Sequence, residues 1–439
     1  MSKVVKFGGS SLASAEQFKK VEKIIRADKS RIWVVPSAPG KRFKNDEKVT
    51  DMLYACYDLA EEGGDFKKAL HVIENRYIEI IEGLELKLSL DEEFKVIEDN
   101  FEKKIGRDYA ASRGEYLNGI IMSAYLGYEF IDAFEVIFFD ETGSFDEKRT
   151  NKVLSERLRG CKNAVVPGFY GSLPDGRVKT FSRGGSDITG SIVAKAAGVD
   201  VYENWTDVSG FLIADPKIIK NPKGIDVITY RELRELSYMG ATVLHEDAIF
   251  PVRREGIPIN IRNTNAPDDE GTWIVGSTGQ KSKYVITGIA GKKGFCSVSV
   301  EKDMMNSEIG FGRKVLRAFE EQGISFEHMP SGIDTLTVFV HQDEFIDKEQ
   351  KVVAGIHRSV KPDAIEIESD LALIAVVGRG MKSTRGTAGR IFSALAHSNV
   401  NVKMIDQGSS ELNIIIGVAN EDFETAIRAI YDIFVLTAI

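Results

Sequence analysis

Strand-like and helix-like segments alternate along the first 280 residues of this chain, and this alternation limits the fold more than any other feature. Such a rhythm is typical of a mainly parallel β-sheet sandwiched by helices. Residues 50–105 have a helical pattern rich in Glu and Lys, which predicts a solvated group of helices over the sheet. The sequence therefore predicts an α/β fold, with clear strands at residues 31–37, 130–139, 163–169, 199–205 and 257–262.

The rhythm changes after a turn-rich stretch at residues 263–282. Shorter strands and helices then alternate as in two βαββαβ-like units in tandem, each of roughly 70 to 75 residues, which predicts two α+β, ferredoxin-like domains. The predicted domains are residues 1–280 and 281–439, and the repeats within the second are about 294–369, and 281–290 plus 370–439.

Composition excludes several classes of protein. A net charge of −9, from 66 acidic against 57 basic residues, argues against binding nucleic acid through its phosphates. Cys56, Cys161 and Cys296 are too few and too far apart for a disulfide framework or a metal site, which favours a reducing cytoplasm. The six histidines have no paired spacing, so no metal site is predicted. Neither a signal peptide nor an apolar run of about 18 residues is present, so no membrane association is predicted.

The first candidate site is the segment Lys6-Phe7-Gly8-Gly9-Ser10-Ser11, which follows a predicted buried strand. A helix begins soon after, because Ser14 and Gln17 have the spacing of a capping box. Backbone N–H groups near a helix start attract anions, and glycine permits their close approach. The segment predicts a phosphate cradle to which Lys6 adds a positive charge, although a plain structural turn is an open alternative.

The common nucleotide-binding motifs do not occur in the chain. There is no Gly-x-x-x-x-Gly-Lys-Ser/Thr loop, no Gly-x-Gly-x-x-Gly after a strand, and no kinase catalytic loop or Asp-Phe-Gly. The families that carry those motifs are therefore disfavoured.

A second glycine pair lies in the segment Thr180-Phe181-Ser182-Arg183-Gly184-Gly185-Ser186-Asp187, ahead of a helix predicted at residues 190–197. Arginine binds a carboxylate through two parallel hydrogen bonds. Asp187 has a second interpretation as a simple helix cap. Two such turns in one sheet suggest that one holds phosphates and the other holds the group that accepts a phosphoryl group.

Two further segments carry candidate site residues. Ser112-Arg113-Gly114-Glu115 is predicted to open a helix, where Glu115 would either complete a capping box or meet a bound ammonium group. Trp205-Thr206-Asp207-Val208-Ser209-Gly210 ends a predicted strand, where open α/β sheets bind ligands, although the same residues also suit an ordinary turn.

Taken together, these motifs resemble those of the aspartate kinase family. The order and spacing match across residues 3 to about 275, and the two C-terminal repeats resemble the ACT regulatory domains of that family. The resemblance covers nearly the whole chain. The segments that carry it are residues 6–11, Val35-Pro36-Ser37-Ala38-Pro39-Gly40, Val49-Thr50-Asp51, 112–115, 181–187 and 205–210.

The resemblance implies an amino-acid-kinase fold and an enzyme of the monofunctional form, without a dehydrogenase domain. Its reaction would transfer the γ-phosphate of ATP to the β-carboxylate of L-aspartate, giving 4-phospho-L-aspartate. This is the first step of lysine, threonine and methionine biosynthesis. Magnesium would accompany the ATP, held mainly by the phosphates.

The resemblance also implies the role of each site residue. Lys6 would contact the phosphates and stabilise the transferring group, and Asp187 would orient Lys6. The aspartate site is implied at Ser37, Thr50, Glu115, Arg183 and Ser186. The nucleotide site is implied at Lys6, Gly8, Gly9, Ser10, Thr206, Asp207, Asp215 and Lys217.

Feedback inhibition by lysine, threonine or both is implied through the first ACT repeat. Glu327 would bind the effector's ammonium group, and N–H groups near Gly310 would bind its carboxylate. The repeats would also form a homodimer or a dimer of dimers, and an interface role alone is the alternative. The effector positions are Met305, Ser307, Gly310, Phe311, Ser325, Phe326, Glu327 and Ser331.

Three positions differ from the family pattern. Thr242 replaces a lysine expected near the nucleotide, Leu212 beside Phe211 replaces an aromatic residue, and Lys217 replaces an arginine. His245 is predicted to pack in a helix. Two alternative functions stay open: a related kinase with another acceptor, such as acetylglutamate, glutamate or a nucleoside monophosphate, and an amino-acid sensor that has lost catalysis.

Overall fold

The computed structural model describes residues 1–182, 184–241, 244, 246–279 and 284–436, and divides the chain into two compact units. Each unit has its own main β-sheet. The first unit contains Met1–Phe211, Gly224–Tyr230 and Thr242–Thr278, and the second contains Leu212–Lys223, Arg231–Ala241 and Gly279–Ile439.

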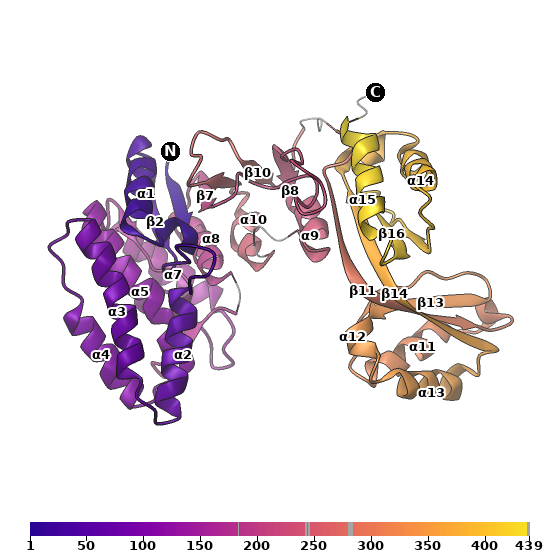
Figure 1. Ribbon diagram of the computed structural model, residues 1–439, viewed down its shortest axis with the longest axis horizontal. Helices are drawn as coiled ribbons and strands as arrows, with labels where there is room; N and C mark the ends of the chain where they lie inside the picture. The colour runs from indigo at the N-terminus through magenta and orange to yellow at the C-terminus, as the bar shows by residue number, and fades with distance from the viewer. Residues whose placement is uncertain (183, 242–243, 245, 280–283, 437–439) are drawn as a thin grey trace. The chain divides into compact units, whose positions relative to one another are not determined.

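An eight-stranded sheet forms the centre of the first unit, in the order β3-β4-β2-β1-β7-β9-β10-β8 (Figure 1). Every neighbouring pair is parallel except β9 and β10, so the predicted mainly parallel sheet is confirmed. The strands are β1 (Lys3–Phe7), β2 (Arg31–Pro36), β3 (Glu129–Phe130), β4 (Ala164–Val165), β7 (Val201–Thr206), β8 (Val227–Thr229), β9 (Ile259–Asn263) and β10 (Thr272–Val275).

The central strands are apolar along most of their length because helices cover both faces of a parallel sheet. Helices α2 to α5 lie side by side in Figure 1 and share one hydrophobic core with β1 and β2. The helical group predicted at residues 50–105 is confirmed. The helices of the first unit are α1 (Ala15–Ala27), α2 (Val49–Glu61), α3 (Lys67–Gly83), α4 (Asp91–Glu102), α5 (Arg107–Leu126), α6 (Ala133–Val136), α7 (Glu147–Arg159), α8 (Gly185–Ala197) and α10 (Phe250–Glu255), with short 3₁₀ turns at Gly9–Leu12 and Glu246–Ile249 and a small hairpin, β5 (Tyr170–Ser172) and β6 (Val178–Thr180).

The strand predicted at residues 130–139 is absent over most of that range, so this prediction was wrong. Of the segment predicted at residues 130–139, only Phe130, the last residue of β3, pairs as a strand in the main sheet. The Asp132 side chain then accepts a hydrogen bond from the N–H of Phe134 at 2.9 Å, and this cap starts α6. A local cap therefore overrode the apolar pattern of the segment.

Two predicted helix starts were also wrong. Helix α8 begins at Gly185 instead of residue 190, because Gly184, with φ 61°, forms its N-cap. Helix α5 begins at Arg107, so Ser112 lies inside it, and its hydroxyl donates to the carbonyl oxygen of Tyr109 at 2.6 Å. The capping-box interpretation of Ser112 and Glu115 is therefore wrong, and Glu115 is left for another role.

A six-stranded antiparallel sheet forms the second unit, in the order β12-β13-β11-β14-β16-β15. The two long strands β11 and β14 pair along most of their length, and Figure 1 shows α11 and α13 near one end of this ribbon and α14 and α15 near the other. The strands are β11 (Gly288–Glu301), β12 (Phe326–His328), β13 (Thr335–His341), β14 (Ala364–Val377), β15 (Met404–Asp406) and β16 (Asn413–Ala419).

The chain order β11-α11-β12-β13-α13-β14 matches the predicted βαββαβ repeat, with the single turn α12 before α13. The helices are α9 (Tyr230–Tyr238), α11 (Phe311–Glu320), α12 (Gln342–Phe345), α13 (Glu349–Val360), α14 (Thr387–His397) and α15 (Phe423–Tyr431), with 3₁₀ turns at Met305–Ser307 and Arg379–Ser383 and a π-helical turn at Asp432–Leu436.

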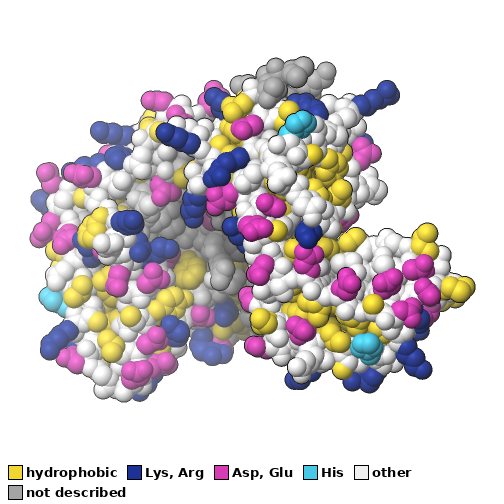
Figure 2. All heavy atoms as spheres, turned by 45° about the vertical axis from the view of Figure 1, so that its right-hand side comes forward, with side chains coloured by type: hydrophobic (Ala, Val, Ile, Leu, Met, Phe, Trp, Pro, Cys, Tyr) yellow, Lys and Arg dark blue, Asp and Glu magenta, His cyan; other side chains and the backbone are white. Residues whose placement is uncertain are grey.

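Within the described part of the chain, no helix combines the length and the apolar character needed to cross a membrane. On the face that Figure 2 shows, basic and acidic side chains are interspersed, in keeping with the mixed charge of the sequence.

Candidate active site

The predicted phosphate cradle lies where β1 ends, at the carboxyl edge of the sheet. The N–H of Gly8 donates to the carbonyl oxygen of Trp205 at 2.9 Å, which joins this turn to the end of β7. Ser14 caps α1 by accepting from the N–H of Gln17 at 3.5 Å. The Gln17 side chain instead donates to Asn265 at 3.4 Å, so only half of the predicted capping box forms.

Two glycines hold the turns after β1 and β2 in direct contact. The N–H of Gly40 donates to the carbonyl oxygen of Gly9 at 2.8 Å. A Cβ on Gly9 would lie 2.8 Å from the carbonyl oxygen of Ala38, and one on Gly40 would lie 2.5 Å from the carbonyl carbon of Gly9. Both positions therefore require glycine, and Gly40 joins the cradle although the sequence analysis gave it no role.

Lys6 and Asp187 meet beside this cradle. The Lys6 Nζ lies 2.5 Å from Oδ1 of Asp187, and the Asn204 amide donates to the same carboxylate oxygen at 2.9 Å. Asp187 is in the first turn of α8, where the helix dipole also stabilises a negative charge. Asn204 is a site residue that the sequence analysis missed, and its only signal was its place near the end of β7.

A cavity of about 570 Å³ opens beside the cradle. It brings together predicted residues of both substrate sites, namely Gly8, Gly9, Ser10, Ser37, Thr50, Glu115, Thr206 and Asp207. Its other lining residues were not predicted: Ala38, Pro39, Gly40, Lys41, Phe43, Lys44 and Lys48.

Glu115 brings a buried carboxyl group to this cavity. Burial raises the pKa of the Glu115 carboxyl to about 8, although hydrogen bonds from the Ala38 N–H and the Ser186 hydroxyl, and the charge of Lys6, act to lower the pKa. Oε2 of Glu115 is buried and has no hydrogen-bond partner among the described residues. An unpartnered buried carboxylate oxygen is suited to receive an N–H donor from a ligand.

Several predicted site residues are not brought to this cavity. Arg183, Thr242 and His245 lie outside the described residues. Asp215 and Lys217 belong to the second unit, where the Lys217 N–H donates to the Asp215 carboxylate at 2.8 Å in an exposed turn. Their role in nucleotide binding stays a prediction.

The predicted effector residues cluster around the start of α11 and along β12 of the second unit. Met305 and Phe311 are buried in the core of this half of the unit, and Gly310, with φ 78°, is the N-cap of α11. Phe326 is 45% exposed. The three serines among the predicted effector positions, Ser307, Ser325 and Ser331, are exposed.

Glu327 is already engaged within the second unit. The Tyr238 hydroxyl donates to Oε2 of Glu327 at 2.6 Å, and Nε2 of His341 lies 3.3 Å from Oε1. A ligand's ammonium group would therefore replace or join existing donors at this carboxylate.

The described residues include no group of three or more His, Cys, Asp or Glu side chains placed to hold a metal ion. The two carboxylates that line the cavity, Glu115 and Asp207, would leave most of the coordination of any magnesium ion to the phosphates of a nucleotide.

Each of the two units contains residues that match a known protein family. The amino acid kinase family matches residues 1–263, and the ACT domain family matches residues 374–434. The first match falls on the unit with the parallel sheet and the second on the antiparallel sheet, so the predicted fold class is confirmed.

Relatives match over almost the whole chain. Aspartokinase 3 of Bacillus subtilis is 41% identical, with 98% of each chain covered. The crystal structure of Clostridium acetobutylicum aspartate kinase is 52% identical, covering 98% of this chain and 99% of that chain, with a TM-score of 0.90. Escherichia coli aspartokinase III, solved with aspartate and ADP, shares the fold at 24% identity and a TM-score of 0.76, covering 99% of each chain. The chain belongs to the aspartate kinase family.

Proposed function

We propose that the cavity at the ends of β1, β2 and β7 holds ATP and L-aspartate together, and that Lys6 stabilises the phosphoryl group as it passes between them. A β-carboxylate oxygen of aspartate attacks the γ-phosphorus, and the bond from this phosphorus to the departing ADP oxygen breaks. The product is 4-phospho-L-aspartate. The observation that carries the proposal is the Lys6–Asp187 ion pair beside a glycine cradle.

The chemistry suits these groups because a carboxylate is already a nucleophile and needs no strong base. The main obstacle is repulsion between two anions, which fixed positive charges and oriented N–H groups relieve. Asp187 and Asn204 hold the Lys6 ammonium group, so its position does not depend on the substrates.

In this proposal the aspartate site combines charge and hydrogen bonds. Glu115 receives the α-ammonium group at its unpartnered Oε2. Arg183 and Ser186 bind a carboxylate, and Ser37 and Thr50, which line the cavity, complete the site.

The nucleotide side combines the cradle with the end of β7. Gly8, Gly9 and Ser10 hold the phosphates, and Thr206 and Asp207, which line the same cavity, contact the adenosine. Magnesium enters with the nucleotide, because phosphate oxygens are among the ligands that it prefers.

We further propose that the predicted domain limits, 1–280 and 281–439, separate catalysis from regulation. Lysine, threonine or both inhibit by binding near Glu327 and the start of α11, and the ACT repeats form the homodimer. The match of an ACT family to residues 374–434 supports a regulatory role for this region.

The test is an assay of aspartate and ATP with hydroxylamine, which traps an acyl phosphate as a hydroxamate. The wild-type protein should form the hydroxamate with aspartate and not with glutamate or acetylglutamate. Lys6→Met should lower kcat by about a hundredfold or more, in line with the loss of a preorganised cation. Lys23→Met, an exposed lysine on α1, is the matched control. A wild-type protein that binds lysine and forms no hydroxamate would instead be an amino-acid sensor.

A further inference from the structure

The loop between β2 and α2 contributes three lysines to the candidate active site. Lys41, Lys44 and Lys48 are exposed and line the cavity beside the cradle. Among the described residues that line the cavity, these three are the basic residues, and Glu115 and Asp207 are the acidic ones. The motif pattern assigned no role to the three lysines.

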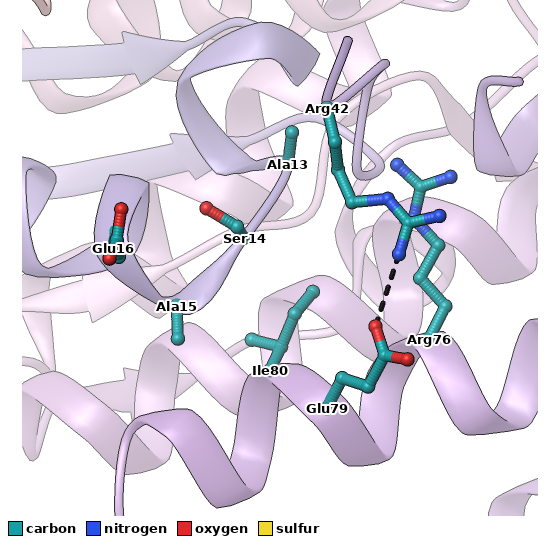
Figure 3. A pocket seen from close by; sticks show the side chains of 8 residues that line it. All are labelled: Ala13, Ser14, Ala15, Glu16, Arg42, Arg76, Glu79 and Ile80. Atoms are coloured by element: carbon teal, nitrogen blue, oxygen red, sulfur yellow. Dashed lines mark hydrogen bonds and ion pairs between the residues drawn. The ribbon is translucent and has the colours of Figure 1, made fainter. Parts of the chain in front are cut away.

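The arginine of this loop, Arg42, forms ion pairs with acidic residues that do not line the cavity. The Arg42 Nε lies 2.9 Å from Oδ2 of Asp46. The Arg42 Nη1 lies 3.1 Å from Oε2 of Glu79 on α3, and Figure 3 shows this second pair. No described residue forms an ion pair with any of the three lysines. The loop therefore pairs its arginine with Asp46 and with Glu79 of α3, and it leaves its lysine charges available at the cavity.

One buried side chain anchors both ends of this loop. Arg76 of α3 is 4% exposed, and it donates from Nη1 to the carbonyl oxygen of Glu47 at 2.7 Å and from Nη2 to the carbonyl oxygen of Gly40. Its Nη2 also lies 3.1 Å from the Asp46 carboxylate. Figure 3 shows Arg76 and Arg42 beside each other at a small neighbouring cavity of about 280 Å³.

The anchored end of the loop is also bonded to the cradle. The N–H of Gly40 donates to the carbonyl oxygen of Gly9, so Lys41 follows directly on a residue in backbone contact with the phosphate-binding turn. At the other end, the N–H of Val49 donates to the carbonyl oxygen of Pro39 at 3.1 Å, which closes the loop at its base.

We infer that Lys41, Lys44 and Lys48 form a cationic rim that binds the β- and γ-phosphates of the nucleotide, and that Arg76 is a positioning residue that holds this rim over the cradle. The inference rests on the proposed function and extends it. Lys6 alone supplies little net charge, because its ammonium group is paired with Asp187. A triphosphate beside an anionic acceptor needs further cations.

Phosphate suits these lysines better than the carboxylates of aspartate do. Lysine acts as a flexible point charge that binds phosphate oxygens from several directions, whereas planar carboxylates are bound best by the fork of an arginine. Three exposed ammonium groups at the mouth of the cavity also attract a highly charged ligand at a distance, and this attraction is weakened by salt.

The test compares the affinities of ATP, ADP and adenosine, each measured by calorimetry with magnesium present. We expect Lys41→Ala, Lys44→Ala and Lys48→Ala each to weaken ATP binding by about threefold, the range of an exposed charge pair. The triple variant should weaken ATP binding by about twentyfold, ADP by less, and adenosine not at all. Its ATP affinity should also depend less on salt than that of the wild type.

The matched control is the triple variant Lys23→Ala, Lys68→Ala and Lys95→Ala, which removes the same charge from exposed positions elsewhere on the first unit. It should bind ATP as the wild type does. Equal ATP affinity in the rim and control variants would overturn the inference, as would an equal loss for adenosine or a change confined to the KM for aspartate.

Arg76→Lys tests the anchor, because a lysine keeps the charge but does not bridge two carbonyl groups in the fixed geometry of a guanidinium. We expect the KM for ATP to rise about tenfold, with kcat at saturating ATP and the KM for aspartate within about twofold of the wild type. A variant that only loosened the fold would lower kcat as well. Asp46→Asn, within the loop, tests the same anchor if Arg76→Lys does not fold.

The same preparations separate the two proposals. A wild-type protein that forms no hydroxamate contradicts the proposed function. An active wild-type protein whose rim variants match the control contradicts the cationic rim alone.

Discussion

At the scale of single residues, Glu115 has the least usual environment in the candidate site. Burial raises its pKa from 4.5 to about 8, and one of its oxygens has no partner among the described residues. Without substrate the carboxyl group is therefore largely protonated at pH 7. An ammonium ligand would favour the ionised form, so binding of aspartate should release a proton.

Glu115→Gln should change the dependence of stability on pH. The folded protein holds the Glu115 proton up to about pH 8, whereas the unfolded chain loses it near pH 4.5. The stability from this proton is complete below pH 4.5 and is lost as the pH rises through 8. Glutamine does not ionise, so the melting temperature of the variant relative to the wild type should increase between pH 4.5 and 8 and then level off.

Calorimetric scans without ligands at pH 5 to 9 measure this difference. Glu141→Gln, at an exposed position, is the control and should show no such trend. A difference between Glu115→Gln and the wild type that stays constant with pH would contradict the raised pKa.

Motifs predicted part of the site and missed the residues that support it. Lys6, Glu115 and Asp187 stood in segments with glycine pairs, hydroxyl groups or charges, so their chemistry was visible in the chain. Asn204 lies in a mostly apolar strand segment, and Arg76 lies in a helix segment with several charged residues. Both segments look like ordinary structural elements. The roles of Asn204 and Arg76 depend on contacts with residues far away in sequence, which no local pattern reveals.

At the scale of elements, the contact between the turns after β1 and β2 controls the shape of the cradle. A Cβ on Gly40 would lie 2.5 Å from the Gly9 carbonyl carbon and 2.6 Å from the Ser10 nitrogen. These are backbone atoms, which do not rotate away. Gly40→Ala should therefore displace the cradle, raise the KM for ATP about tenfold, and lower the free energy of unfolding by about 1–3 kcal/mol.

Steady-state kinetics and chemical unfolding measure these effects. Gly276→Ala is the control, because a Cβ at that position meets nothing within 4 Å. An unchanged KM for ATP in Gly40→Ala would show that the two turns do not need their close contact for binding.

A buried ion pair joins α9 to the Arg379–Ser383 turn within the second unit. Glu232, with a fully buried side chain, accepts from the Thr287 hydroxyl at 2.6 Å and lies 3.0 Å from Nη1 of Arg379. Glu232→Ala removes the buried carboxylate that binds both Arg379 and Thr287, so we expect the free energy of unfolding of the second unit to fall by about 3 kcal/mol or more. Glu320→Ala, exposed on α11, is the control for calorimetry, and equal shifts in both variants would contradict a structural role for the pair.

Element types were easier to predict than element limits. The alternation of apolar segments indicated the parallel sheet and the antiparallel repeat, because burial requires those periods. The limits depended on single capping contacts, such as Asp132 before α6 and Gly184 before α8. Short strands such as β8 and β10 carried too few residues for a periodic signal.

At the scale of the whole molecule, the chain joins a kinase unit to an antiparallel unit whose strands β11 and β14 pair along most of their length. In the sequence, the strands and helices become shorter near residue 280, and the domain limit set there stays a prediction. The structure adds that Leu212–Lys223 and Arg231–Ala241 belong to the second unit although they lie within the predicted kinase domain. Packing, which is not local in sequence, decided their place.

Feedback regulation of the whole enzyme gives the last prediction, which concerns Glu327. The proposed effector's ammonium group competes with the Tyr238 hydroxyl, which donates to Glu327 at 2.6 Å. Glu327→Ala should raise the lysine concentration that halves activity at least about tenfold, because a buried or partly buried charge pair of this kind contributes about 1.4 kcal/mol or more to binding. Tyr238→Phe should lower that concentration, because it removes the competing donor.

The readout is the ratio of activity with and without lysine at each concentration, which is independent of the basal rate. Glu320→Ala serves as the exposed control on α11. Inhibition that responds equally to all three substitutions would place the effector elsewhere, and activity indifferent to millimolar lysine and threonine would contradict feedback through this site.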